Sequence, residues 1–199
     1  MDTVRSVGNC FPAADPIDSN RTPKLIAWLE HLMEISDTGL EEMRDPLARQ
    51  NAVLKTATAD WEWDPQQDYL KRSSESHIDG IYKILTGEIE PVGETHEDQV
   101  HWYDERLESY RQAMEWSGTR RRSFVSLNGR IGLGPQSLQP GDSVAEIAGT
   151  DVPFALRRRE DGGYQLVGEV YMHGVMDGEH RHQYFEKLSW PERQIFEVY

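Results

Sequence analysis

The chain has 199 residues, and its 35 acidic and 21 basic side chains give a formal net charge of −14. A charge this negative repels nucleic-acid phosphates and anionic lipid, so we expect no nucleic-acid and no membrane partner. The single cysteine, Cys10, excludes an internal disulfide framework and a cysteine-based zinc cluster, and it fits a reducing compartment. The sequence has no recognisable signal peptide or membrane span, and we expect a cytoplasmic protein.

Residues 1–21 mix proline, asparagine and charged residues without periodicity, and we expect an irregular leader there. A helical region follows over residues 22–118. Thr22-Pro23 and Asp45-Pro46 each place a capping residue before a proline, which is typical of a helix start. Apolar residues then recur at spacings of three and four, and Gly39 ends the first of these two helices.

Two further helices are expected in the same region. Trp61 and Trp63 fall in a predicted loop, after which Asp64 caps the third helix. Thr95 and Asp98 form a variant capping box that opens the fourth helix, whose apolar residues alternate at steps of three and four. We expect the four helices to pack antiparallel.

The pattern changes to strand-like alternation after residue 118. Apolar residues alternate on both sides of Asn128-Gly129, a dipeptide that type I′ turns favour, and this predicts a β-hairpin. Turn residues separate further predicted strands at residues 144–148, 152–158 and 164–172. The sequence therefore predicts an α+β fold, with N-terminal antiparallel helices packed on a small C-terminal antiparallel β-sheet or barrel over residues 119–199. We expect leader, helices and sheet to form one compact domain.

A polar group in the last predicted strand is the strongest candidate for chemistry: Glu169, Tyr171, His173 and Asp177. Strand alternation places the first three on one face, and the neighbouring glycines let Asp177 approach that face. A histidine near neutrality, a carboxylate and a tyrosine hydroxyl can transfer protons, so these four are the candidate catalytic residues. The structural alternative, which we favour, is that the strand residues pair with neighbouring strands and His173 satisfies a backbone carbonyl.

Nitrogen and oxygen ligands for a divalent metal are also present at His173, Asp177, His180 and His182, but their spacing matches no standard site. The closely spaced glycines at residues 129–134 lie inside a predicted hairpin, so they do not form a phosphate-binding loop. We therefore predict no metal and no cofactor.

Aromatic residues of the helical region are the candidate substrate-binding residues: Trp61, Trp63, Trp102 and His101. Exposed aromatic rings can line a ligand site or a partner surface, although tryptophan more often packs in a core. The arginine runs at residues 120–122 and 157–159 are expected to neutralise the acidic helical half.

Four segments of the β-rich region resemble one known family. They are residues 124–135 (FVSLNGRIGLGP), 139–142 (QPGD), 152–157 (VPFALR) and 164–179 (YQLVGEVYMHGVMDGE). These segments are similar to the C-terminal region of fungal heterokaryon-incompatibility (HET) domain proteins. They share the order and spacing of the segments and the combination Tyr-x-His-Gly-x-Met-Asp-Gly. The resemblance implies a filamentous-fungal source and a helix-plus-β fold, and it transfers no catalytic residue. The HET domain itself, with its Tyr-x-Ala-Leu-Ser-Tyr-x-Trp-Gly type motif, does not occur in this sequence.

Two functions remain open at this point. The first is a stand-alone binding or regulatory module derived from a HET protein, which recognises a protein partner and predicts an exposed aromatic patch. The alternative is a small cofactor-independent enzyme of fungal secondary metabolism, such as a cyclase, isomerase or lyase, acting on a small-molecule substrate. It predicts a pocket between helices and sheet, lined by His173 and its polar neighbours.

Overall fold

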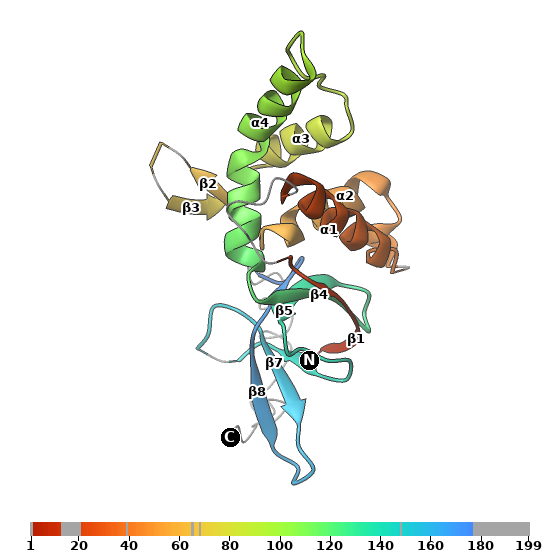
Figure 1. Ribbon diagram of the computed structural model, residues 1–199. Coiled ribbons are helices and arrows are strands. Elements are labelled where there is room, and N and C mark those ends of the chain that lie inside the picture. The colour runs from red at the N-terminus through yellow and green to blue at the C-terminus, as the bar shows by residue number, and fades with distance from the viewer. Residues whose placement is uncertain are drawn as a thin grey trace.

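The computed structural model describes residues 2–12, 21–38, 40–64, 66–67, 69–147 and 149–176. Within these ranges, four α-helices lie on one side of a curled β-sheet, and a short hairpin projects beside them (Figure 1). The helices are α1 (Arg21–Ile35), α2 (Pro46–Ala57), α3 (Glu75–Leu85) and α4 (His96–Gly118), with a 3-10 turn, Glu41–Met43, before α2. The predicted α+β class is confirmed. No helix in the described ranges is long and apolar enough to cross a bilayer.

Local capping bonds place two of the helices where the sequence predicts them. The Asp45 carboxylate accepts a hydrogen bond from the Ala48 amide (3.1 Å), and Pro46 occupies the first turn of α2. At α4, Thr95 Oγ1 accepts from the Asp98 amide (3.1 Å), and the Asp98 carboxylate accepts from the Thr95 amide (3.1 Å). These bonds satisfy amides that the first helical turn leaves free, which is why the two helix starts can be recognised locally.

The large sheet is antiparallel, with the strand order β8-β7-β6-β1-β4-β5-β9. Its strands are β1 (Asp2–Cys10), β4 (Arg121–Ser126), β5 (Ile131–Pro135), β6 (Ser143–Ala145), β7 (Phe154–Arg158), β8 (Tyr164–Glu169) and β9 (Tyr171–Met172). The predicted hairpin is confirmed as β4 and β5. Its turn is not the type I′ turn that Asn128-Gly129 suggested, because Gly129 has a positive φ of 82° but Asn128 does not have a positive φ. The other three predicted strands correspond to β6, β7 and the successive strands β8 and β9.

The sheet curls until its two ends approach each other, which makes it barrel-like (Figure 1). β8 and β9 follow each other in the chain, yet they stand at opposite ends of the strand order. Val170 joins them, and its amide donates to the Pro153 carbonyl (2.9 Å). Nearby, a Cβ added at Gly168 of β8 would lie 2.7 Å from the Pro135 side chain of β5, so glycine is needed for this close approach.

The predicted irregular leader is wrong for residues 2–10, because they form the central strand β1, which pairs with β4 and β6. The pairing with β4 contains two register shifts, so β1 lacks the strict alternation by which a strand is recognised in a sequence. Helix α1 also holds this strand, since the Asn9 amide donates to Nε2 of His31 (3.1 Å). Residues 13–20 of the predicted leader lie outside the described residues.

The predicted third helix is wrong at its start, because a hairpin occupies the region around Asp64. The hairpin consists of β2 (Trp61–Asp64) and β3 (Tyr69–Arg72). Asp64 caps its turn by accepting hydrogen bonds from the amides of residues 66 and 67, and α3 begins only after Ser74. The predicted loop at Trp61 and Trp63 is also wrong, because both residues lie in β2. They alternate at strand spacing and favour β-structure, a signal that the loop prediction did not use.

Alternate side chains of the sheet contribute to two separate cores. Phe124 and Met172 belong to the cluster inside the barrel. Their chain neighbours Val125 and Tyr171 belong to the other cluster, in which they pack with helical residues such as Leu32. Because successive residues of a strand face opposite sides, β4 and β9 serve both cores.

The arginines expected to neutralise the helical half make contacts within the β-rich part instead. Arg122 donates to the Gly8 carbonyl of β1 (2.9 Å). Arg157 binds the buried Asp142 carboxylate through two hydrogen bonds of 2.8 Å. These two residues therefore stabilise the barrel.

Candidate functional site

The predicted catalytic group is only partly assembled. Tyr171 and His173 lie together at the end of β9, with 3.3 Å between Tyr171 Oη and Nδ1 of His173. Tyr171 is buried in the helical core, whereas His173 is half-buried. Glu169 does not join them, because it ends β8 before the chain crosses at Val170, and it is exposed. Outside the described residues lie Asp177, His180 and His182.

A carboxylate that the sequence analysis missed stands near this pair. Glu75, the first residue of α3, accepts hydrogen bonds from Lys55 Nζ (2.7 Å) and Asn51 Nδ2 (3.1 Å) of α2. These bonds and the Lys55 charge lower the pKa of Glu75, and His173 adds a smaller effect in the same direction. In the sequence, Glu75 looks like an ordinary acid in a first helical turn. Glu75 thus connects α3 to α2, and its charge interacts with that of His173.

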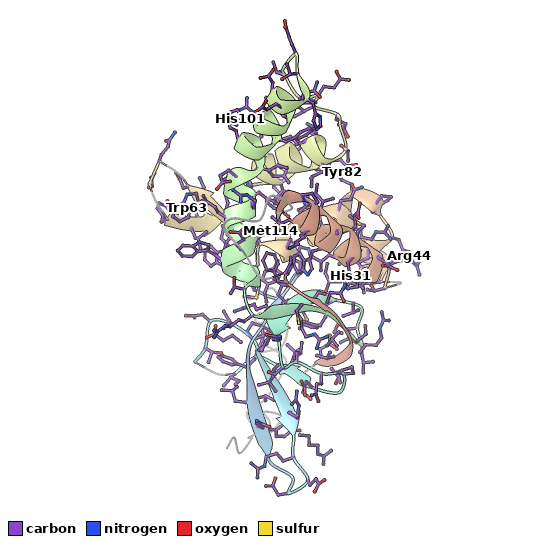
Figure 2. The ribbon with its side chains drawn as sticks, viewed as in Figure 1. His31, Arg44, Trp63, Tyr82, His101 and Met114 are labelled. Carbon is purple, nitrogen blue, oxygen red and sulfur yellow. The ribbon has the colours of Figure 1, made fainter. Side chains whose placement is uncertain are left out.

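An apolar hollow among the helices lies apart from this polar cluster. Aliphatic side chains of α1, α3 and α4 line it together with Tyr110 and Met114, and its cavity volume is about 30 Å³. Figure 2 labels Met114, on α4. Small-molecule sites usually have volumes of roughly 300–1,000 Å³, so this hollow does not match the polar-lined pocket that the enzyme hypothesis predicts.

Aromatic side chains gather where the β2–β3 hairpin meets the C-terminal half of α4. Trp61 and Trp63 share one face of β2 with Leu70 and Arg72, their cross-strand partners. The ring of Trp63 lies 5.8 Å from that of Trp116, and the Arg72 guanidinium lies 5.2 Å from the centre of the Trp61 ring. Trp61 is 37% exposed and Trp116 is 68% exposed. We call these five residues the aromatic corner.

Trp116, the member of the aromatic corner from α4, is not among the candidate residues predicted from the sequence. The residue falls outside the apolar stripe of α4 and lies far from the hairpin in the sequence. In the sequence, the sign that Trp116 belongs to a surface site is its position on the polar side of an amphipathic helix.

Buried polar contacts fix the base of the hairpin. The Glu62 carboxylate accepts hydrogen bonds from the Ser74 amide (2.9 Å) and hydroxyl (3.0 Å), and Lys71 Nζ lies 3.4 Å from it. Burial raises the pKa of Glu62, but the Ser74 hydrogen bonds and the charges of His77 and Lys71 outweigh this and lower it. Lys71 Nζ also lies 3.1 Å from the Asp64 carboxylate. The hairpin is thus held against the start of α3 with a defined orientation.

Trp102 and His101 do not join the other predicted substrate-binding residues. Both lie near the start of α4, roughly 20 Å along the helix from Trp116 at 1.5 Å per residue. Figure 2 shows this separation, with His101 near one end of α4 and Trp63 on the hairpin. Trp102 packs edge-on against Tyr103, and His101 lies 3.3 Å from Glu105. The predicted set therefore divides into two surfaces.

Comparisons with known proteins agree with the resemblance seen in the sequence. The family model described as the Het-6 beta-barrel domain matches residues 66–187. Heterokaryon incompatibility protein 6, OR allele, of Neurospora crassa is 44% identical over 62 residues, which are 30% of this chain and 9% of that protein. No solved structure matches. The family match covers more than half of the chain and includes β3 to β9, so the chain belongs to the Het-6 β-barrel domain family of HET-related fungal proteins.

Proposed function

We propose that the chain is a binding and regulatory module of a HET-related fungal system and that the aromatic corner is its recognition surface for a protein partner. The observation that carries this proposal is the gathering of three indole rings, from β2 and α4, at the surface. Tryptophan and arginine are the residues that most often dominate binding energy in protein interfaces.

The fixed base of the hairpin supports the same role. A surface that is already ordered loses less conformational freedom on binding than a flexible one. Glu62 bonds to Ser74 on one face of the hairpin, and Trp61 and Trp63 occupy the opposite face. The polar face thus anchors the hairpin and leaves its apolar face to the aromatic corner.

Affinity capture with matched variants tests this function. The wild-type chain, a Trp61→Ala/Trp116→Ala double variant and a Leu127→Ala control are used as baits in an extract of the source fungus. Leu127 is 63% exposed and lies in the β4–β5 turn, away from the aromatic corner. We expect the wild-type and control baits to recover the same partner. We expect the amount recovered by the double variant to be about tenfold lower. Equal recovery by all three baits contradicts the proposal.

One observation favours a second candidate, a cofactor-independent cyclase, isomerase or lyase. The 3.3 Å contact between Tyr171 Oη and His173 Nδ1, with Glu75 near them, is an arrangement suited to proton transfer. If this candidate is correct, we expect a gene-deletion strain to accumulate a compound. The purified protein converts this compound, and the His173→Ala protein does not convert it. If the deletion strain and the parent strain have the same metabolite profile while the parent expresses the gene, the enzyme candidate is contradicted.

A further inference from the structure

Strand β1 lies at the centre of the large sheet but buries few of its side chains. Among its nine described residues, Val4 is the one that is buried, and Arg5, Ser6, Asn9 and Cys10 are exposed. In the neighbouring strand β4, by contrast, the last four residues are all buried. Since hydrophobic stabilisation scales with the apolar area removed from water, β1 gains less from burial than its central position suggests.

The backbone pairing of β1 is also interrupted. Its pairing with β4 contains two register shifts. Its pairing with β6 covers two residue pairs, those of Asp2 and Thr3. Register shifts of this kind leave hydrogen bonds of the strand ladder unformed. We therefore expect β1 to open at a lower free energy than the rest of the sheet.

When β1 leaves the sheet, it uncovers a slot between β4 and β6. The Leu127 amide loses its acceptor, the Thr3 carbonyl (2.7 Å), and the Gly141 amide loses the Val4 carbonyl (2.9 Å). The place of Val4 in the core of the barrel also becomes empty. Unpaired amides and carbonyls at a strand edge readily pair with another chain.

The slot is selective for the segment that fills it. A Cβ added at Gly8 would collide with Ser123 Oγ and would lie 2.6 Å from Nε2 of His31. The Arg122 guanidinium donates to the Gly8 carbonyl as well (2.9 Å). A segment that fits therefore needs glycine at this place and an apolar residue four positions earlier, as β1 has. A second copy of the chain carries this segment.

We propose that β1 exchanges between two copies of this chain, so that residues 2–12 of each copy complete the barrel of the other. Every contact of β1 is retained in this reciprocal dimer, and neither slot remains unpaired. Exchange of an identical element is a low-cost route to a dimer, because it needs no new complementary surface. The dimer is independent of the aromatic corner, to which none of residues 2–12 belongs.

Interchain disulfide formation tests the exchange, because Cys10 is the single cysteine and lies opposite Arg122 in the pairing of β1 with β4. Opposed residues of antiparallel strands have Cα atoms about 4.5–5.5 Å apart, a separation that a disulfide can bridge. One full chain keeps Cys10, and a second full chain carries Cys10→Ser and Arg122→Cys. The two proteins are unfolded in urea, refolded together and oxidised, and a non-reducing gel separates the products.

The matched control replaces Arg122→Cys by Leu127→Cys. The Leu127 amide bonds to Thr3, which lies about 24 Å along the strand from Cys10. We expect the Arg122→Cys protein to give about tenfold more disulfide-linked pair than the control, because a seated strand holds the two thiols at a millimolar effective concentration. Equal yields from the two proteins, both folded by circular dichroism, overturn the exchange.

A second measurement uses unaltered chains and does not depend on folding of the Arg122 variant. Two full chains with different affinity tags are refolded together, and one tag is captured after dilution. We expect the other tag to be recovered, and an excess of a peptide of residues 2–12 during refolding to abolish this recovery. The same peptide with Gly8→Val is expected to have no effect.

The remaining outcomes of the capture also decide the proposal. Absence of the second tag overturns the dimer. Recovery that the peptide of residues 2–12 does not reduce means that the copies meet elsewhere, which overturns the exchange. Recovery that is lost with Trp61→Ala/Trp116→Ala would assign the contact to the aromatic corner instead of β1.

Discussion

Asp142 joins the loop before β6 to strand β7 through one almost fully buried carboxylate. It accepts two hydrogen bonds from Arg157 and one from the Gln139 amide, each 2.8 Å long. Asp142→Asn keeps the shape of the side chain but removes its charge and one of the two bonds to Arg157. We expect this change to lower the free energy of unfolding, measured in urea, by about 2–3 kcal/mol.

A matched pair elsewhere in the barrel provides the control for this prediction. Arg159 and Asp161 also form an ion pair (2.8 Å), but both side chains are about half exposed. Asp161→Asn is expected to change stability much less, because solvent screens the pair. Similar losses in the two variants would show that burial does not determine the strength of these pairs.

His77 makes the stability of the protein depend on pH. Burial lowers the pKa of His77 below its ordinary value of 6.5, although the Glu62 carboxylate opposes this. The unfolded chain therefore binds a proton at this position more readily than the folded protein, and stability falls as the pH drops below 6.5. We expect the free energy of unfolding to decrease between about pH 7.5 and 5.5, and to decrease less in His77→Gln. Urea titrations at both pH values measure the difference, and an identical decrease in the variant refutes the assignment to His77.

At the scale of an element, β5 can pair with both neighbours only because it carries glycine at position 132. A Cβ there would collide with the Tyr171 carbonyl oxygen of β9 and would lie 2.6 Å from the Phe124 ring of β4. Gly132→Ala is expected to lower the free energy of unfolding by about 3 kcal/mol. Gly80→Ala, in α3 with nothing within 4 Å of its added methyl group, is expected to raise it by about 0.5–1 kcal/mol. Chemical denaturation of both proteins tests the opposite signs.

Elements with local signals were predictable from the sequence, and those defined by distant pairing were not. The caps at Asp45 and Thr95 and the turn at Gly129 follow from neighbouring residues. β1 could not be recognised, because its register shifts hide the alternation and its partners lie far along the chain.

The same distinction explains the candidate sites. Tyr171 lies in β9 and His173 directly follows this strand, so strand alternation predicts that the two side chains meet. Glu75 and Trp116 reach their partners through the packing of helices from other parts of the chain, which a local pattern does not contain. The hairpin of Trp61 and Trp63 was missed because a capping signal at Asp64 is equally suited to a turn.

At the scale of the whole molecule, the matched family region is smaller than the structure that supports it. Residues 66–187 lack β1, which lies between β4 and β6, and they lack α1 and α2, which supply much of the helical core. We expect a protein of residues 66–187 to show no cooperative thermal unfolding, because its sheet is interrupted and its core exposed. The near-ultraviolet circular dichroism of this fragment, compared with the full chain during heating, measures this.

A second truncation isolates the contribution of the strand alone. Removing only residues 2–12 leaves every helix in place and opens the sheet between β4 and β6. We expect this protein also to lose its sharp transition, since both flanking strands lose their hydrogen-bonded neighbour. A sharp transition in either truncated protein would mean that the remaining residues fold as an independent unit.

The position of β1 also affects how the protein is made. The strand leaves the ribosome before its partner β4, because its contact between Gly8 and Arg122 joins residues 114 positions apart. At 5–20 residues per second, translation leaves this strand unpaired for roughly ten seconds. During that time it exposes an unsatisfied backbone edge to other nascent chains and to chaperones. The order of synthesis, as well as the final fold, therefore shapes the demand that this protein places on the cell's folding machinery.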